Sequence, residues 1–270
     1  MTWASCLFAI LILGLVLIGG WLLVREEAGA PVDDMLNSQM LEKNGGREVE
    51  AEDVVYFKDA RGYFARPSDE GTYPGVVMIH EWWGLNDNIK NMARELAKEG
   101  YQVLAVDLYG GEVATTSEDA QKLRNAILPS DAVLNLRGAA AYLRGAQSSK
   151  VASLGWCFGG GQSLALSLSG EKLDATVIYY GSPLVTEAGE LQKISWPVLG
   201  IFGETDQSIP VTTVNAFDTA LTSLGVSHQI AVYPGVGHAF ANPSGQNYAP
   251  EETKDAWGKT LAFLEENLKK

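Results

Sequence analysis

The sequence has few residues of the kinds that build metal sites or disulfide frameworks. It contains two cysteines and three histidines in 270 residues, and it has no CxxC motif and no Cys/His cluster. Cys6 lies in an apolar N-terminal run and Cys157 lies far along the chain, so we expect no disulfide between them. We therefore expect no metal and no cofactor, and the neighbours of Cys157 must indicate its chemistry.

Positive charge is also scarce. Lys and Arg number 20 against 33 Asp and Glu, which gives a net charge of −13. Binding to nucleic acid needs a basic face, so nucleic acid is not expected as a partner. We interpret the acidity as a source of solubility.

One long stretch near the N-terminus has no charged residue at all. Residues 3–24 are apolar or small, and about 20 such residues suffice to span a bilayer as a helix. The sequence therefore predicts a membrane segment at 1–24, a polar linker at 25–47 and one folded domain at 48–270. A monomer is favoured.

The alternative for the N-terminal segment is a cleaved signal peptide, which would leave a secreted or periplasmic protein. Ala28-Gly29-Ala30 resembles a cleavage site, but Pro31 follows it and the start of the chain carries no Lys or Arg. These features favour an uncleaved single-span anchor. Arg25 alone would keep the domain cytoplasmic, whereas signal-anchor segments often translocate the domain attached to them, and we slightly favour an extracytoplasmic domain.

The rest of the chain alternates short β-branched runs with amphipathic stretches. This alternation predicts an α/β fold with a mostly parallel central sheet and helices on both faces. The residues 54–67 look like an antiparallel start. Further strands are expected at 75–80, 102–110, 151–155, 175–181, 197–203 and 228–235, and helices at 87–99, 117–127, 131–144, 160–169, 211–224 and 251–268.

Cys157 stands at a predicted strand–turn–helix junction. The strand 151–155 runs directly into Gly155-Trp156-Cys157-Phe158-Gly159, a G-x-C-x-G pattern. A nucleophile on such a sharp turn crowds the residues two before and two after it, and glycine at both places relieves the clash. The turn also places the thiol at a helix N-terminus, where a thiolate and a developing oxyanion are favoured. The alternative is a buried cysteine in a glycine-rich turn without chemistry.

Two partners follow in the chain order that such a turn requires, first an acid and then a histidine. Asp206 follows the strand that ends near Gly203, and His238 lies in a glycine-rich loop after the strand 228–235. Both loops are expected at the same sheet edge as Cys157. His238 would accept the proton of Cys157, and Asp206 would hold the imidazole in the required tautomer.

Other residues could take these roles. Glu204 is the alternative acid, and Asp206 would then only cap a helix. His80, at the end of the strand 75–80, and His228, at the start of the strand 228–235, are interpreted as structural.

Four segments together resemble one enzyme family. The stretches HEWWGLN (80–86), DLYG (107–110), GWCFGG (155–160) and YPGVGHAF (233–240) are similar to those of the dienelactone hydrolases, or carboxymethylenebutenolidases, of the α/β-hydrolase superfamily. The resemblance covers about residues 50–268. It implies hydrolysis of a small-molecule ester or lactone by a Cys–His–Asp triad through an acyl-enzyme, without a cofactor.

The resemblance implies further roles. Glu81 would interact with the resting Cys157 and help to form the thiolate. The backbone N–H groups of Phe158 and Trp82 would stabilise the oxyanion. Aromatic side chains near the motifs suggest a substrate pocket, formed by Trp83, Trp156, Tyr109 and Phe240.

The chain also departs from the family pattern. Family members that cleave dienelactone hold the substrate carboxylate with two arginines. Asn242 stands at one of those places, and the helix 117–127 offers Lys122 and Arg124 for the other. A broader carboxylesterase or thioesterase is therefore the first alternative, and an inactive membrane-tethered binding module is the second.

Overall fold

The computed structural model describes residues 46–270. The predicted anchor at 1–24 and nearly all of the linker at 25–47 lie outside these residues. Within 46–270, no helix is both long and apolar enough to cross a membrane. The membrane segment and its orientation therefore stay predictions, as does the domain boundary at residue 48.

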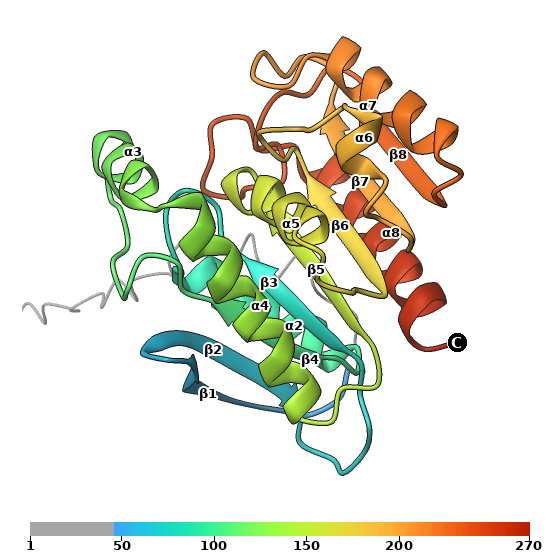
Figure 1. The fold of residues 1–270 in the computed structure, drawn as a ribbon. Coiled ribbons are helices and arrows are strands. Elements are labelled where there is room, and N and C mark those ends of the chain that lie inside the picture. The colour runs from blue at the N-terminus through green and yellow to red at the C-terminus, as the bar shows by residue number, and fades with distance from the viewer. Residues whose placement is uncertain (1–45) are drawn as a thin grey trace, which may run out of the picture.

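An eight-stranded sheet forms the centre of the described chain (Figure 1). The strands are β1 (Val49–Phe57), β2 (Ala60–Pro67), β3 (Gly75–Ile79), β4 (Gln102–Val106), β5 (Val151–Trp156), β6 (Ala175–Tyr179), β7 (Val198–Gly203) and β8 (His228–Tyr233). Their order is β1-β2-β4-β3-β5-β6-β7-β8. Strands β3 to β8 pair in parallel, whereas β2 pairs antiparallel with both β1 and β4.

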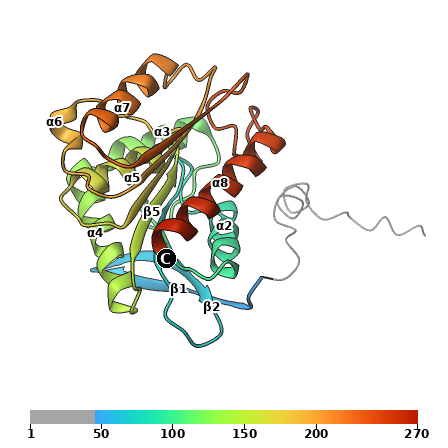
Figure 2. The same cartoon turned by 90° about the vertical axis from the view of Figure 1, so that its right-hand side faces the viewer.

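Helices cover both faces of this sheet. They are α2 (Asp87–Lys98), α3 (Ser117–Ala126), α4 (Pro129–Gly145), α5 (Phe158–Leu168), α6 (Ala188–Leu191), α7 (Val211–Ser223) and α8 (Pro250–Leu268). Figure 2 shows α2 and α8 on one face, with α4, α5, α6 and α7 on the other. This arrangement confirms the predicted α/β-hydrolase-like fold.

Local sequence accounts for most of these elements. Every residue of β3, β4, β5, β6 and β7 is buried, as expected for parallel strands covered on both faces. Helix α2 begins where the Asn86 side chain accepts the Ile89 N–H at 3.2 Å, and it buries the apolar side that its spacing predicted. The four-residue α6 was not predicted, because it is shorter than two helical turns and leaves no periodic signal.

The parallel strands position the candidate site. The carboxyl ends of β3, β5, β7 and β8 are followed by the segments that carry Glu81, Cys157, Asp206 and His238. Strands that run in parallel deliver such segments to one edge of the sheet. Residues more than a hundred positions apart in sequence can therefore meet there.

Candidate active site

Cys157 sits on a strained turn between β5 and α5. Its backbone has φ 53° and ψ −116°, a region that non-glycine residues rarely adopt. Its N–H donates to Tyr179 O at 3.0 Å, and its own carbonyl accepts the Gly161 N–H at 3.1 Å. These bonds hold the turn, and the thiol remains partly exposed at the start of the helix.

The turn around Cys157, called the elbow below, has glycine at 155 and 159. Both glycines are required because other backbone atoms pass very close to them. A Cβ on Gly155 would lie 2.1 Å from Gly159 O, and a Cβ on Gly159 would lie 2.3 Å from Ile79 O. Both distances are far below van der Waals contact, and the atoms met are backbone atoms that cannot move aside cheaply. The spacing G-x-C-x-G therefore has the steric cause that the sequence suggested.

Cys157, His238 and Asp206 form one chain of contacts. His238 Nε2 lies 3.2 Å from Cys157 Sγ, and His238 Nδ1 lies 2.7 Å from Asp206 Oδ2. The second oxygen of Asp206 accepts the N–H groups of Ser208 at 2.7 Å and Ile209 at 3.1 Å. The Asp206 side chain is fully buried, so its oxygens are held in place by donors and cannot turn away from the imidazole.

This environment acts on the protonation of His238. Burial lowers the pKa of His238, but the hydrogen bonds to Asp206 and Cys157 and the charges of both groups raise it, with a net result of about 10. An imidazolium between two acidic groups is stabilised, which is the charge state a histidine passes through after it takes a proton from a nucleophile.

The alternative residues occupy other places. Glu204 is exposed, and its Oε2 accepts the Gly235 N–H at 3.0 Å, so it secures the loop that precedes His238. His228 pairs with Asp218, at 3.1 Å between Nε2 and Oδ1. Among residues 46–270, the hydrogen bond to the thiol comes from His238 and not from Glu204 or His228.

His80 is also structural in its contacts. It is fully buried. Its Nε2 accepts the Leu108 N–H at 3.2 Å, so Nδ1 carries the proton and donates to Glu81 O at 2.5 Å. Burial lowers the pKa of His80, and the neutral ring ties the end of β3 to the segment after β4.

Glu81 has a different partner from the one that the resemblance implied. Its Oε2 accepts the side-chain N–H of Asn242 at 2.5 Å, and among the described residues no hydrogen bond joins it to Cys157. Burial raises the pKa of Glu81 to about 7, although the charge of His238 and the nearby polar groups of Asn242 and Tyr180 act to lower it. Asn242 is thus the hydrogen-bond partner that holds Glu81, and the implied action of Glu81 on the resting Cys157 stays a prediction.

Two backbone donors, one next to Cys157 in the chain and one next to Glu81, have no acceptor in the part of the chain that the structure describes. They are the N–H groups of Phe158, the first residue of α5, and of Trp82. The first N–H groups of a helix have no intrahelical partner. These donors are therefore available to a ligand oxygen.

The predicted pocket aromatics separate into two groups. Tyr109 packs its ring against His80 at 4.7 Å and Phe158 at 6.0 Å, beside the elbow. Burial raises the pKa of Tyr109, and the charge of Arg124 acts against this, which places Arg124 on the same side of the site. Trp83 packs edge-to-face with Trp82 at 5.1 Å, and both indoles are partly exposed.

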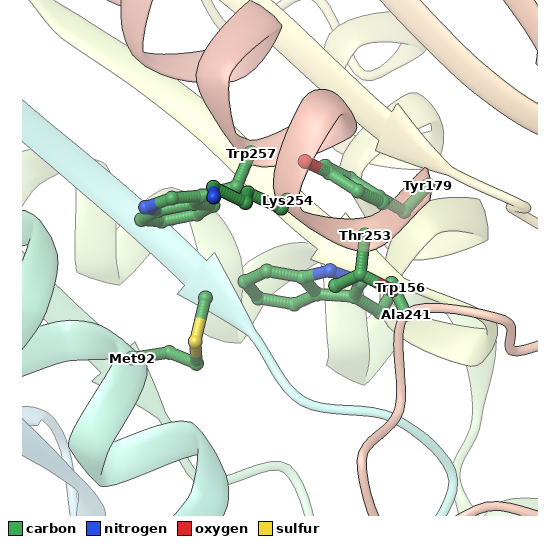
Figure 3. A pocket seen from close by; sticks show the side chains of 7 residues that line it. All are labelled: Met92, Trp156, Tyr179, Ala241, Thr253, Lys254 and Trp257. Atoms are coloured by element: carbon green, nitrogen blue, oxygen red, sulfur yellow. The ribbon is translucent and has the colours of Figure 1, made fainter. Parts of the chain in front are cut away.

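The other two aromatics are buried, and their predicted contact with substrate stays a prediction. Phe240 is fully buried against Tyr180 and Tyr233. Trp156 is 5% exposed and lines a small cavity together with Met92 of α2 and Trp257 of α8 (Figure 3). Successive residues of a strand point to opposite faces, which explains why Trp156 is buried although it adjoins the partly exposed Cys157.

Tyr180 was missed by the sequence reasoning. It follows β6, has φ 35° and packs its ring edge-to-face against His238 at 5.3 Å. The only local signal was its place at the end of a buried strand, which is also true of many residues without a role at the site.

Comparisons with known proteins agree with this geometry. The dienelactone hydrolase family matches residues 60–268. The protein usf of Aquifex pyrophilus is 34% identical over 223 residues, which cover 77% of this chain and 94% of that protein. A protein of Saccharolobus solfataricus that is provisionally named carboxymethylenebutenolidase is 31% identical over 261 residues, covering 78% and 97%.

A solved structure gives the same result. The dienelactone hydrolase-like promiscuous phosphotriesterase from metagenomic libraries superposes with a TM-score of 0.72 at 28% identity, covering 83% of this chain and 99% of that one. The fold, the matched length and these relatives together show that the chain belongs to the dienelactone hydrolase family and is a carboxylic ester hydrolase.

Proposed function

We propose that this protein hydrolyses an ester or lactone in two steps, with Cys157 as nucleophile, His238 as general base and acid, and Asp206 as the residue that orients His238. The observation that carries the proposal is the continuous contact from Sγ to Nε2 at 3.2 Å and from Nδ1 to Oδ2 at 2.7 Å. A nucleophile in contact with a base that a third group orients is the arrangement of covalent acyl transfer.

In the first step the Cys157 sulfur attacks the carbonyl carbon and its proton passes to His238 Nε2. The C=O bond becomes an oxyanion, which the N–H groups of Phe158 and Trp82 stabilise. The oxyanion then collapses, the alkoxide leaves with the proton from His238, and a thioester remains on Cys157.

In the second step His238 takes a proton from water, and the resulting hydroxide attacks the thioester carbonyl. The second tetrahedral oxyanion uses the same two backbone donors. Its collapse releases the carboxylic acid and returns the proton to the Cys157–His238 pair.

Hydrolysis of p-nitrophenyl acetate by the full chain in detergent tests the proposal. We expect turnover that Cys157→Ala abolishes. His238→Gln should act in the same way, whereas His228→Gln is the matched control because it removes the other His–Asp pair of the described chain, away from the thiol. Undiminished turnover in Cys157→Ala would refute the mechanism.

A broader carboxylesterase or thioesterase is the second candidate, and the position of Asn242 favours it. This residue is buried, donates to Glu81 and carries no charge, so it does not supply the second cation of a carboxylate clamp. Arg124 is exposed on α3, and its charge acts on Tyr109, so it remains the candidate for the first cation.

A pair of lactones that differ only by a free carboxylate or its methyl ester separates the two candidates. A broad esterase should turn over the methyl ester at least as well as the free acid. A strong preference for the free acid that is lost in Arg124→Gln would instead support a dienelactone-type substrate.

A further inference from the structure

Two buried polar atoms behind the triad lack a hydrogen-bond partner among residues 46–270. They are Oε1 of Glu81 and the hydroxyl of Tyr180. Leaving a buried polar atom unpaired costs about 1–3 kcal/mol, so native structures supply a partner in nearly every case. We therefore expect a common hydrogen-bond partner for these two atoms.

These atoms lie close to each other. The charge of Glu81 acts to raise the pKa of Tyr180, and the Tyr180 hydroxyl acts to lower the pKa of Glu81. The Ala241 N–H also acts on the Tyr180 hydroxyl. No direct hydrogen bond of normal length joins any of them, so the polar groups are near but separated by a gap of the kind that a water molecule bridges.

A cavity occupies this place. Its walls include Glu81, Tyr180, Ala241, Asn242, Met92 and Trp156, and it has about 20 Å³ of free space, which exceeds the roughly 10–15 Å³ that one water molecule needs. A polar wall with two to four potential partners is the other requirement for a buried water. The Glu81 carboxylate, the Tyr180 hydroxyl and the Ala241 amide meet it.

A second cavity adjoins the first. It shares Met92, Trp156 and Ala241 with the first cavity, and it continues to Lys254 and Trp257 on α8 (Figure 3). Lys254 is exposed. The cavity beside Glu81 is therefore bordered by a second cavity that extends toward an exposed residue of α8.

We propose that one buried water bridges Glu81 Oε1 to the Tyr180 hydroxyl, and that Tyr180 is thereby a positioning residue for Glu81. This inference rests on the proposed cysteine mechanism. Tyr180 contacts the triad directly, since its ring packs on His238. The aromatic ring thus supports the base, while the hydroxyl and its water secure Glu81.

The groups around Glu81 determine how its pKa would change if the Tyr180 hydroxyl were removed. The titratable groups that face Glu81 are His238, from the loop after β8, and Tyr180, from the end of β6. Helix α2 contributes Asn88, Ile89 and Met92 to the cavity wall, and none of these titrates. Since burial already raises the pKa of Glu81 to about 7, losing a donor to the carboxylate moves this pKa further upward.

The pH dependence of Cys157 alkylation by iodoacetamide tests the proposal without requiring turnover. The full chain is alkylated over a range of pH, and the rate is followed on the Cys157 peptide by mass spectrometry. We expect an inflection near pH 7 in the wild type that is absent in Glu81→Gln. In Tyr180→Phe it should move upward by about 0.5–1 pH unit.

Tyr179→Phe is the matched control. It removes a neighbouring buried hydroxyl that bonds to Thr260 at 2.6 Å and not to Glu81. The inflection should stay in place in this variant, which separates a specific effect from general loosening of β6. Identical profiles for the wild type and Tyr180→Phe would overturn the positioning role.

A crystal structure of the wild-type full chain tests the water itself, and it is informative even if Tyr180→Phe does not fold. Density for one water within hydrogen-bonding distance of both Glu81 Oε1 and the Tyr180 hydroxyl is the expected result, and an empty cavity would refute the bridge. Ester hydrolysis that survives Cys157→Ala would instead overturn the mechanism, an outcome that is visible separately in the turnover assay.

Discussion

Replacing Asp206 by asparagine tests the orientation of His238 with almost no change in volume. In the wild type, one Asp206 oxygen accepts the N–H groups of Ser208 and Ile209, and the other faces His238 Nδ1 at 2.7 Å. An asparagine has one oxygen. If that oxygen keeps the two backbone donors, an NH₂ group faces the imidazole.

The consequence for His238 depends on its two nitrogens. Opposite an NH₂ donor, Nδ1 becomes the acceptor and the proton moves to Nε2. Nε2 then can no longer take the proton of Cys157, 3.2 Å away. In serine enzymes the corresponding change costs about 10⁴-fold in kcat. A thiol is easier to deprotonate than a hydroxyl, so we expect a loss of about 10²–10⁴-fold here, or about 3–5 kcal/mol in the activation barrier.

The assay is kcat/KM for p-nitrophenyl acetate with the full chain in detergent, together with thermal unfolding to show that the variant is folded. Asp218→Asn is the control, because Asp218 makes the same kind of contact with His228 away from the thiol. It should leave the rate unchanged. An Asp206→Asn variant that is folded and keeps more than about a tenth of the activity would refute the orientation argument.

Three further predictions concern stability and location. Because the folded-state pKa of Glu81, about 7, lies above its ordinary 4.5, the folded protein is favoured while this group is protonated and loses stability as the pH rises through 7. Glu81→Gln should therefore raise the free energy of unfolding by about 3 kcal/mol near pH 8.5 and change it little near pH 4. Urea unfolding titrations at the two pH values measure this difference, and equal effects of the substitution at both would contradict the reasoning. Gly159→Ala should cost about 2–4 kcal/mol in the same assay, since its Cβ would meet Ile79 O at 2.3 Å, whereas Gly258→Ala, in α8 with nothing within 4 Å, should be neutral or add up to about 1 kcal/mol. Finally, the full chain should remain with membranes after a carbonate wash and a chain without residues 1–24 should not; release of both would rule out the anchor.

Much of the fold could be predicted from short-range patterns. The apolar runs of β3 and β7 and the apolar side of α2 follow from hydrophobic periodicity alone. The elbow around Cys157 could be predicted for a similar reason. The clashes that require Gly155 and Gly159 arise mainly within a few residues of Cys157 or with the neighbouring strand, so the local spacing of glycines predicts the turn.

The sequence by itself also placed Asp206 and His238 in loops at the correct sheet edge, but it left Glu204 open as the acid. Only the tertiary structure shows that Asp206 is the one of the two that contacts His238, because this contact joins loops 32 residues apart in the chain. The hydrogen-bond partner of Glu81 could not be predicted from the sequence either, since Asn242 lies 161 residues away along the chain. The exposure of the aromatic side chains also depends on tertiary structure. It is set by the sheet face to which each side chain points and by the helix that covers that face, such as α8 over Trp156. Contacts of this kind form between elements whose separation in space is set by the packing of the whole sheet, and no local pattern of residues encodes them.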